Sequence, residues 1–114
     1  MKEFRKIEFY KDYFITYYLG LPSSVQKKYE YVFVVIKQAE KVPIKFLKKI
    51  KDTQNLFEIR VESGSDIYRT FCSLEEKKIV VLYNSFQKKS AKTPSQEIKK
   101  AIDIQKEYYE ERND

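Results

Sequence analysis

The stretch Leu56–Lys89 reads LFEIRVESGSDIYRTFCSLEEKKIVVLYNSFQKK, and it decides the fold because it predicts two consecutive β-hairpins. Its first six residues alternate apolar and charged side chains, which is the period of a half-buried strand. Turn-forming residues occupy 63–66, and Ile67–Cys72 is rich in β-branched and aromatic residues, as expected of the returning strand. If residues 63–66 form the loop, Glu62 pairs with Ile67. Counting back from that pair sets Arg60 directly opposite Arg69.

Two arginines facing each other across an antiparallel pair destabilise a sheet. The arrangement therefore suggests that an anion belongs between Arg60 and Arg69. The alternative is a pair of solvated arginines in a different register, since a slip of one residue moves the side chains of a strand to the other face. The spacing alone leaves both interpretations open.

A second hairpin follows through a polar turn at 73–78. Residues 79–83 form a continuous apolar run, which is typical of a strand covered on both faces. This strand leads into the lysines Lys88, Lys89 and Lys92. Thr93-Pro94-Ser95-Gln96 then predicts a helix start, with Thr93 as N-cap and Pro94 at the first helical position. The N-terminus of such a helix favours negative ligands.

These segments resemble, in order and spacing, HigB-type toxins of the RelE superfamily, and more narrowly the phage-derived branch of that family. The resemblance runs from about Phe9 to Tyr109. It rests on LFEIR at 56–60, Tyr68-Arg69, residues 82–86 followed by Lys88-Lys89, and Thr93-Pro94 before a helix that carries Ala101. One departure is Asn84, which stands where members often carry a histidine, and this bears on proton transfer more than on the fold.

The resemblance implies a ribosome-dependent mRNA endonuclease that is blocked by a cognate helix-turn-helix antitoxin of the HigA type. RNA cleavage by the neighbouring 2′-hydroxyl needs a group that takes the hydroxyl proton, cations at the phosphate, and a proton for the leaving 5′-oxygen. Arg60 and Arg69 suit the cationic part because the guanidinium fork matches phosphate oxygens. Glu58 shares the strand face of Arg60 and could be the base. Its ordinary pKa of roughly 4.3 favours instead a role in neutralising and orienting the arginines.

The lysines Lys88 and Lys89 are the other candidates for proton transfer, because clustered cations disfavour one another's charged form. Adjacent side chains of an extended chain point to opposite sides, so only one of the two is expected to face the arginines. The resemblance favours Lys89 as the catalytic cation and Lys88 as a contact to the RNA backbone or ribosomal RNA. The predicted catalytic residues are thus Glu58, Arg60, Arg69 and Lys89, and the predicted RNA-binding residues are Phe71, Lys88 and Lys92.

Aromatic residues of the same strands leave further alternatives. Phe71 shares the arginine face and could stack on a base, although packing in the core is equally compatible with its position. Tyr68 is expected in the core because it points to the opposite face, and Tyr83 is a possible stacking or proton-transfer group. The lysines Lys45, Lys48, Lys49 and Lys51 are interpreted as a solvated face rather than as a nucleic-acid contact.

Composition narrows the classes of function. A chain of 114 residues fits one domain, 1–114, and 42% hydrophobic residues with 16% aromatics argue against disorder. The formal net charge of +6 favours a polyanionic partner such as RNA or the ribosome. The sequence has one cysteine, Cys72, and no histidine, which rules out a Cys/His zinc site and a Cys–His nucleophile. No Asp/Glu spacing suggests a two-metal nuclease, so no cofactor is expected.

The remaining segments predict an α+β fold of RelE type, in which an N-terminal helical hairpin packs on a small, mostly antiparallel sheet and a C-terminal helix follows. The expected elements are a short edge strand within 4–10, a helix at 12–19, a helix from an N-cap at Ser23 to about Lys41, a basic connection at 44–50 and a helix from Ser95 to about Arg112. The sequence shows neither a signal peptide nor a span able to cross a bilayer, which favours the cytoplasm. Two other functions stay open: a non-catalytic ParE-like toxin that inhibits DNA gyrase, and a small nucleic-acid-binding regulator.

Overall fold

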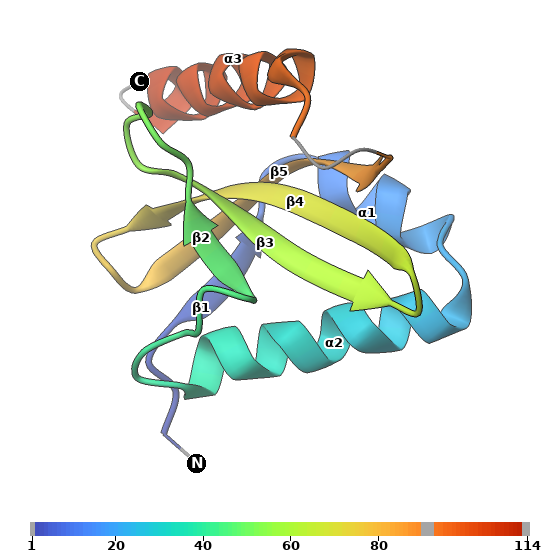
Figure 1. Ribbon diagram of the computed structural model, residues 1–114. Coiled ribbons are helices and arrows are strands. Elements are labelled where there is room, and N and C mark those ends of the chain that lie inside the picture. The colour runs from blue at the N-terminus through green and yellow to red at the C-terminus, as the bar shows by residue number, and fades with distance from the viewer. Residues whose placement is uncertain (1, 90–92, 113–114) are drawn as a thin grey trace.

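The computed structural model describes residues 2–89 and 93–112, which form a five-stranded sheet with helices on both faces (Figure 1). The strand order is β1-β5-β4-β3-β2. β1 pairs with β5 in parallel, and the other neighbours are antiparallel, so the prediction of a mostly antiparallel sheet is confirmed. The strands are β1 (Lys6–Phe9), β2 (Leu47–Lys49), β3 (Leu56–Ser63), β4 (Asp66–Glu75) and β5 (Ile79–Lys88).

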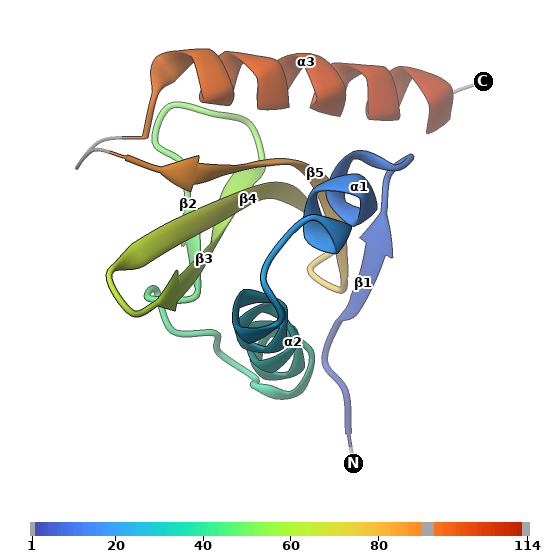
Figure 2. The ribbon, with the colours of Figure 1, turned by 90° about the vertical axis from the view of Figure 1, so that its right-hand side faces the viewer.

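The helices enclose the sheet from two sides (Figure 2). α1 (Tyr13–Leu19) and α2 (Ser23–Gln38) cover one face, and α3 (Ser95–Arg112) covers the other. The buried residues of α2 recur at the spacing of one helix face, as the sequence predicts: Val25, Tyr29, Val32 and Ile36. The opposite core joins Ala101 and Ile104 of α3 to Leu56, Phe71, Val81 and Tyr83 of the sheet.

The two ends of α2 and the presence of β2 differ from the prediction. α2 begins at Ser23 because the Pro22 carbonyl accepts hydrogen bonds from the amides of Val25 and Gln26, so Ser23 lies inside the helix rather than at its cap. The helix ends at Gln38, three residues before the expected Lys41. The basic connection at 44–50 contains the edge strand β2, whose three residues are too few to show a period-two pattern.

The first hairpin has the predicted register. Glu62 pairs with Ile67, and Arg60 pairs with Arg69. The strands extend by one further pair, Ser63 with Asp66, which leaves a two-residue loop. Gly64 has a φ of 62° in that loop, a conformation that a glycine adopts without strain.

The second hairpin contains a β-bulge that the sequence did not reveal. Thr70 pairs with Ser85 and Cys72 with Leu82, so Tyr83 and Asn84 together lie opposite Phe71. Strict alternation from Tyr83 would direct Lys89 to the α3 face of the sheet. The extra residue instead sets Phe86 opposite Arg69 and Lys88 opposite Ile67, so both Phe86 and Lys88 lie on that face.

A chain of buried and partly buried hydroxyl groups connects α2 to the strands next to this bulge. The Tyr29 hydroxyl lies 2.9 Å from Thr70 Oγ1, which lies 2.8 Å from Ser85 Oγ. Thr70 precedes Phe71 and Ser85 follows Asn84, so the chain fixes both strands where the ladder is irregular.

The mutation Tyr29→Phe should lower the free energy of unfolding by about 1 kcal/mol, because it removes one buried hydrogen bond and keeps the ring. Urea denaturation measures the change. The matched control is Tyr31→Phe on the exposed side of the same helix, which should stay within about 0.5 kcal/mol of the wild type. Equal losses in the two variants would show that the hydroxyl chain does not stabilise the sheet.

Candidate functional site

Five of the charged side chains on the α3 face of the sheet form what we term the charged cluster: Lys48, Glu58, Arg60, Arg69 and Lys88. They come from four neighbouring strands. Lys48 of β2 pairs with Glu58 of β3, and Arg60 pairs with Arg69 of β4. Lys88 of β5 reaches this face because of the bulge. The cluster thus combines four cations with one buried carboxylate.

Glu58 lies between the two arginines. Its Oε1 is 3.6 Å from Arg60 Nε and 3.8 Å from Arg69 Nε, and its Oε2 accepts a hydrogen bond from Thr93 Oγ1 at 3.3 Å. Glu58 is only 7% exposed, so solvent screens these interactions weakly. The carboxylate therefore offsets the repulsion between the arginines, and its geometry fits the orienting role better than that of a free base.

The two arginines differ in depth. Arg69 is 2% exposed, and its Nη1 donates to the Tyr68 carbonyl at 3.1 Å. Burial lowers the pKa of Arg69 from its ordinary value, Arg60 lowers it further, and Glu58 opposes both effects. Arg60 is partly exposed and extends over the sheet edge, where its Nη1 donates to the Ile44 carbonyl at 3.4 Å. Arg60 is thus the outer arginine, and Arg69 lies beneath the surface.

The structure corrects the expected geometry of the lysines. Lys88 shares the face of the arginines, whereas Lys89 follows the end of β5 and is exposed. Burial of its ammonium lowers the pKa of Lys88, Arg69 adds to that effect, and Glu58 opposes it. The cation beside the arginines is therefore Lys88 rather than Lys89. Lys92, the third lysine of the prediction, lies outside the described residues.

Of the two alternatives for Phe71, stacking on an RNA base and packing in the core, the structure shows packing. Phe71 is fully buried, and its ring stacks on that of Phe86 at a centroid distance of 5.7 Å. Tyr83 is buried as well, with its hydroxyl 2.7 Å from Ser73 Oγ, so it does not reach a ligand. Tyr68 lies in the core on the opposite face, as predicted.

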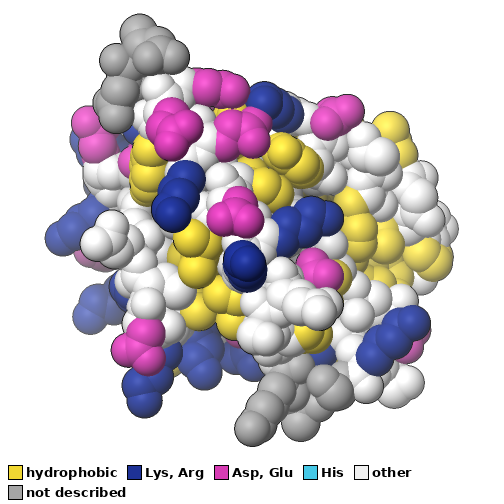
Figure 3. Space-filling view, turned by 90° about the horizontal axis from the view of Figure 1, so that it is seen from above, with side chains coloured by type: hydrophobic (Ala, Val, Ile, Leu, Met, Phe, Trp, Pro, Cys, Tyr) yellow, Lys and Arg dark blue, Asp and Glu magenta, His cyan; other side chains and the backbone are white. Residues whose placement is uncertain are grey.

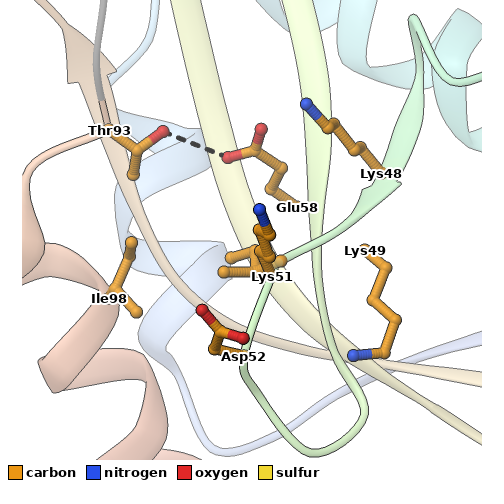
Figure 4. A pocket seen from close by; sticks show the side chains of 8 residues that line it. Lys48, Lys49, Lys51, Asp52, Glu58, Thr93 and Ile98 are labelled. Carbon is orange, nitrogen blue, oxygen red and sulfur yellow. Dashed lines mark hydrogen bonds between the residues drawn. The ribbon is translucent and has the colours of Figure 1, made fainter.

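A hollow of about 560 Å³ opens beside the cluster, between the chain after β2 and the start of α3 (Figure 4). In this view Thr93 and Ile98 lie on one side of the hollow, Lys48 and Lys49 lie on the other, and Glu58 and Lys51 lie between them. Lys48, Lys49 and Lys51, which the sequence suggested were merely solvated, line this hollow. Their place depends on the pairing of β2 with β3, which the local sequence did not predict.

The start of α3 is fixed differently from the prediction. The helix begins at Ser95, and the Pro94 carbonyl accepts hydrogen bonds from the amides of Glu97 and Ile98. The Thr93 hydroxyl donates to Glu58 instead of acting in the predicted capping box. Asn84 is buried at the bulge and donates from Nδ2 to the Glu97 carbonyl at 3.3 Å, which ties β5 to the first turn of α3.

The surface charge is uneven. Seen from the α3 side, Lys and Arg side chains gather toward the lower left of the molecule, while the middle of this face mixes both signs with apolar groups (Figure 3). Within residues 2–89 and 93–112, no group of three or more Asp, Glu or Cys side chains could hold a metal ion. No helix in the part of the chain that the structure describes is long and apolar enough to cross a membrane.

Comparison with known proteins gives one family. Residues 17–106 match the model of the family described as phage derived protein Gp49-like (DUF891). Comparisons with curated proteins and with solved structures gave no match.

The mutation Glu58→Gln should lower the free energy of unfolding by about 1–3 kcal/mol, because it leaves the repulsion between Arg60 and Arg69 without a counter-charge. Added sulfate should restore part of the loss, since an anion can replace the carboxylate. Thermal and urea unfolding with and without sulfate measure both effects. Glu110→Gln, at an exposed glutamate near the end of α3, is the control and should respond weakly to sulfate. A response to sulfate that is equal in the two variants would argue against an anion site at the cluster.

Proposed function

The chain belongs to the phage-derived Gp49-like family, a toxin-like family of RelE type, and from this membership and the charged cluster we propose that it is the toxin of a type II toxin–antitoxin system. Its activity is the cleavage of mRNA on the ribosome. The observation that carries the proposal is the position of Arg60, Arg69 and Lys88 on one face, with Glu58 between the arginines. These three cations carry more positive charge than Glu58 neutralises, and this excess would stabilise the additional negative charge that the phosphate carries in the transition state.

The proposed reaction is attack by a ribose 2′-oxygen on the neighbouring phosphorus. The bond from phosphorus to the 5′-oxygen breaks, which leaves a 2′,3′-cyclic phosphate and a 5′-hydroxyl. The 2′-hydroxyl loses its proton, and the leaving 5′-oxygen gains one. No electrons are exchanged with a co-reactant, so the step needs only proton transfers and stabilisation of charge.

Arg60 and Lys88 are the groups that would contact the phosphate oxygens, because they share the sheet face of Arg69 and are less buried than Arg69. Donors fixed by packing before the reaction cost no reorganisation in the transition state. Arg69 is buried beneath Arg60 and would not contact the phosphate. Its charge makes the electrostatic potential at the phosphate more positive, and together with Glu58 it positions Arg60. Glu58 is engaged by both arginines and by Thr93, so its role is orientation rather than proton transfer.

Lys88 is the best placed group to act at the leaving oxygen. Its lowered pKa makes it a stronger acid than an ordinary lysine, and it lies among the cations that stabilise the phosphate. Lys48, Lys49 and Lys51 extend the positive surface along the adjacent hollow, where they would follow the RNA backbone.

The partner in the proposed system is a helix-turn-helix antitoxin of the HigA type. A positive, ligand-competent face must be masked in the producing cell, and complementary charge on the antitoxin would speed association at low salt. A reading frame for such a protein beside that of the toxin would support the system. It would not identify the target.

The mutation Arg60→Ala should slow cleavage of ribosome-bound mRNA by about 10²–10³-fold, the typical cost of losing one preorganised donor. Single-turnover reactions mapped by primer extension measure this rate. Arg112→Ala, an exposed arginine at the far end of α3, is the control and should keep the rate of the wild type. Arg69→Ala should also slow the reaction and should in addition reduce stability, because Arg69 is buried.

If the wild-type protein leaves ribosome-bound mRNA intact, the proposal that it is a nuclease is wrong. Inhibition of DNA gyrase by that protein would then favour a ParE-like toxin. Rapid cleavage of naked RNA would instead overturn the requirement for the ribosome.

The pH dependence of cleavage should report on Lys88. A lysine is charged below its pKa, so the lowered pKa of Lys88 means that the rate should begin to fall at a lower pH than an ordinary lysine would cause. Lys88→Arg stays charged throughout and should move this alkaline decline to higher pH. Lys89→Arg is the matched control and should leave the profile unchanged. A rate that rises with pH in this range would show that Lys88 acts in its neutral form, as a base.

A further inference from the structure

A second groove, of about 220 Å³, lies on the outer side of Arg60. We term it the Tyr31 groove. It runs between α2 and the chain that leads into β2. The side chains that matter to the argument are Lys28, Tyr31, Lys45, Phe46 and Arg60.

The groove exists because β2 is shorter than the strand beside it. β2 pairs with β3 only as far as Leu47 with Ile59, while β3 continues to Ser63. In the described part of the chain, the last backbone hydrogen bond along this edge runs from the Arg60 amide to the Phe46 carbonyl at 2.8 Å. Past that point the edge of β3 and the side of α2 border open space.

Tyr31 provides an aromatic ring at this opening. It lies off the buried face of α2 and is 59% exposed. The edge of one ring meets the face of the other in the pair Tyr31–Phe46, with centroids 6.0 Å apart at an interplanar angle of 75°. The Lys45 ammonium lies 4.9 Å from the centre of the Phe46 ring. An exposed aromatic ring flanked by cations is the arrangement with which proteins stack the bases of single-stranded RNA.

Arg60 connects the groove to the charged cluster. Its Nε lies 3.6 Å from Glu58 Oε1 in the cluster, and its Nη1 donates to the Ile44 carbonyl beside the groove. One guanidinium therefore borders both places. A phosphate bound at Arg60 would leave the neighbouring nucleotide of the same strand at the mouth of the groove.

We infer that the Tyr31 groove binds the base of a nucleotide next to the phosphate held by the charged cluster, with stacking on Tyr31. The inference rests on the proposed function and names a subsite for it. Lys28 and Lys45 would contact the flanking phosphates. The groove is lined by three cations and one carboxylate, Glu62, so its net positive charge favours a polyanion. Because Arg60 borders both the groove and the charged cluster, the RNA strand bound at the cluster is a better candidate for the groove than a separate protein segment.

The test measures the affinity of the purified protein for a fluorescein-labelled, single-stranded RNA hexamer with 2′-O-methyl riboses, which cannot be cleaved by 2′-hydroxyl attack. A series of hexamers carries one abasic nucleotide at each position in turn. Tyr31→Ala should weaken binding of the intact hexamer roughly tenfold, within the range found for a stacked base, and Tyr31→Phe should stay within about twofold of the wild type. One abasic position should weaken binding to the wild type by a similar factor and have little further effect on Tyr31→Ala.

Salt and a second aromatic residue supply the controls. Lys45→Ala should reduce the salt dependence of binding, while Tyr31→Ala should leave it unchanged, because stacking releases no counterions. Phe9→Ala, at an exposed ring on β1 that does not line the groove, should bind like the wild type.

The outcomes separate this inference from the proposed function. Binding that depends on Arg60 but not on Tyr31 or on any single base would overturn the subsite and leave the proposed function standing. Failure of the wild type to bind the hexamer would overturn the subsite, while cleavage on the ribosome would test the function independently. Loss of antitoxin binding in Tyr31→Ala, with RNA binding intact, would reassign the groove to a protein partner.

Discussion

The structure depends on one unfavourable contact, the pairing of Arg60 with Arg69 across β3 and β4. The pair is held in place by the two cores rather than by itself. Ile59, Val61 and Tyr68 face α2, and Leu56 and Phe71 face α3. A slip of one residue would turn all of these apolar side chains to the wrong side, at a cost far above the repulsion of two partly compensated charges. Burial therefore imposes the register, and Glu58 moderates its electrostatic cost.

The same sheet face serves as core at one end and as site at the other. Along β3 it changes from Leu56 to Glu58 to Arg60, and along β4 from Phe71 to Arg69. α3 covers the apolar end, and Thr93, just before the helix, donates to Glu58. Asn84 ties the first turn of α3 to β5. The start of α3 thus lies at the boundary between the apolar core and the charged cluster. A shift of the helix would change the orientation of Glu58 and, through Glu58, the positions of both arginines.

Sequence reasoning succeeded where two independent signals agreed. In the first hairpin, period-two alternation and turn residues both specify the pairing of Arg60 with Arg69. In α3, the position of Pro94 and the spacing of apolar residues both specify Ser95–Arg112, although the predicted cap at Thr93 is wrong. Sequence reasoning failed where one extra residue in a strand turns the following side chains to the other face of the sheet without changing the hydrophobic pattern. The bulge at Tyr83 and Asn84 depends on how β5 fits against β4 and α3. Alternation predicted only that one of the two lysines faces the arginines, and the resemblance favoured Lys89, whereas the structure has Lys88 facing them.

Other parts of the site had no local signal at all. β2 has three residues, two of them lysines, and only its pairing with β3 brings Lys48 opposite Glu58. Phe71 and Phe86 are alike in sequence terms, yet their stacking buries Phe71 completely. The exposure of Tyr31 follows from the short β2, which leaves one edge of β3 open beside α2.

The excess of positive charge links stability to binding. Four cations around one buried carboxylate repel one another, and this repulsion opposes folding whenever no anion is present. A phosphate that binds the native cluster and not the unfolded chain relieves that repulsion and stabilises the fold by mass action. Glu58 supplies part of this negative charge within the site and so reduces the repulsion in the protein that has no phosphate bound. The carboxylate must nevertheless be too weak a substitute to exclude the phosphate, and its long contacts of 3.6 and 3.8 Å to the guanidinium groups, in place of short bidentate pairs, satisfy that condition.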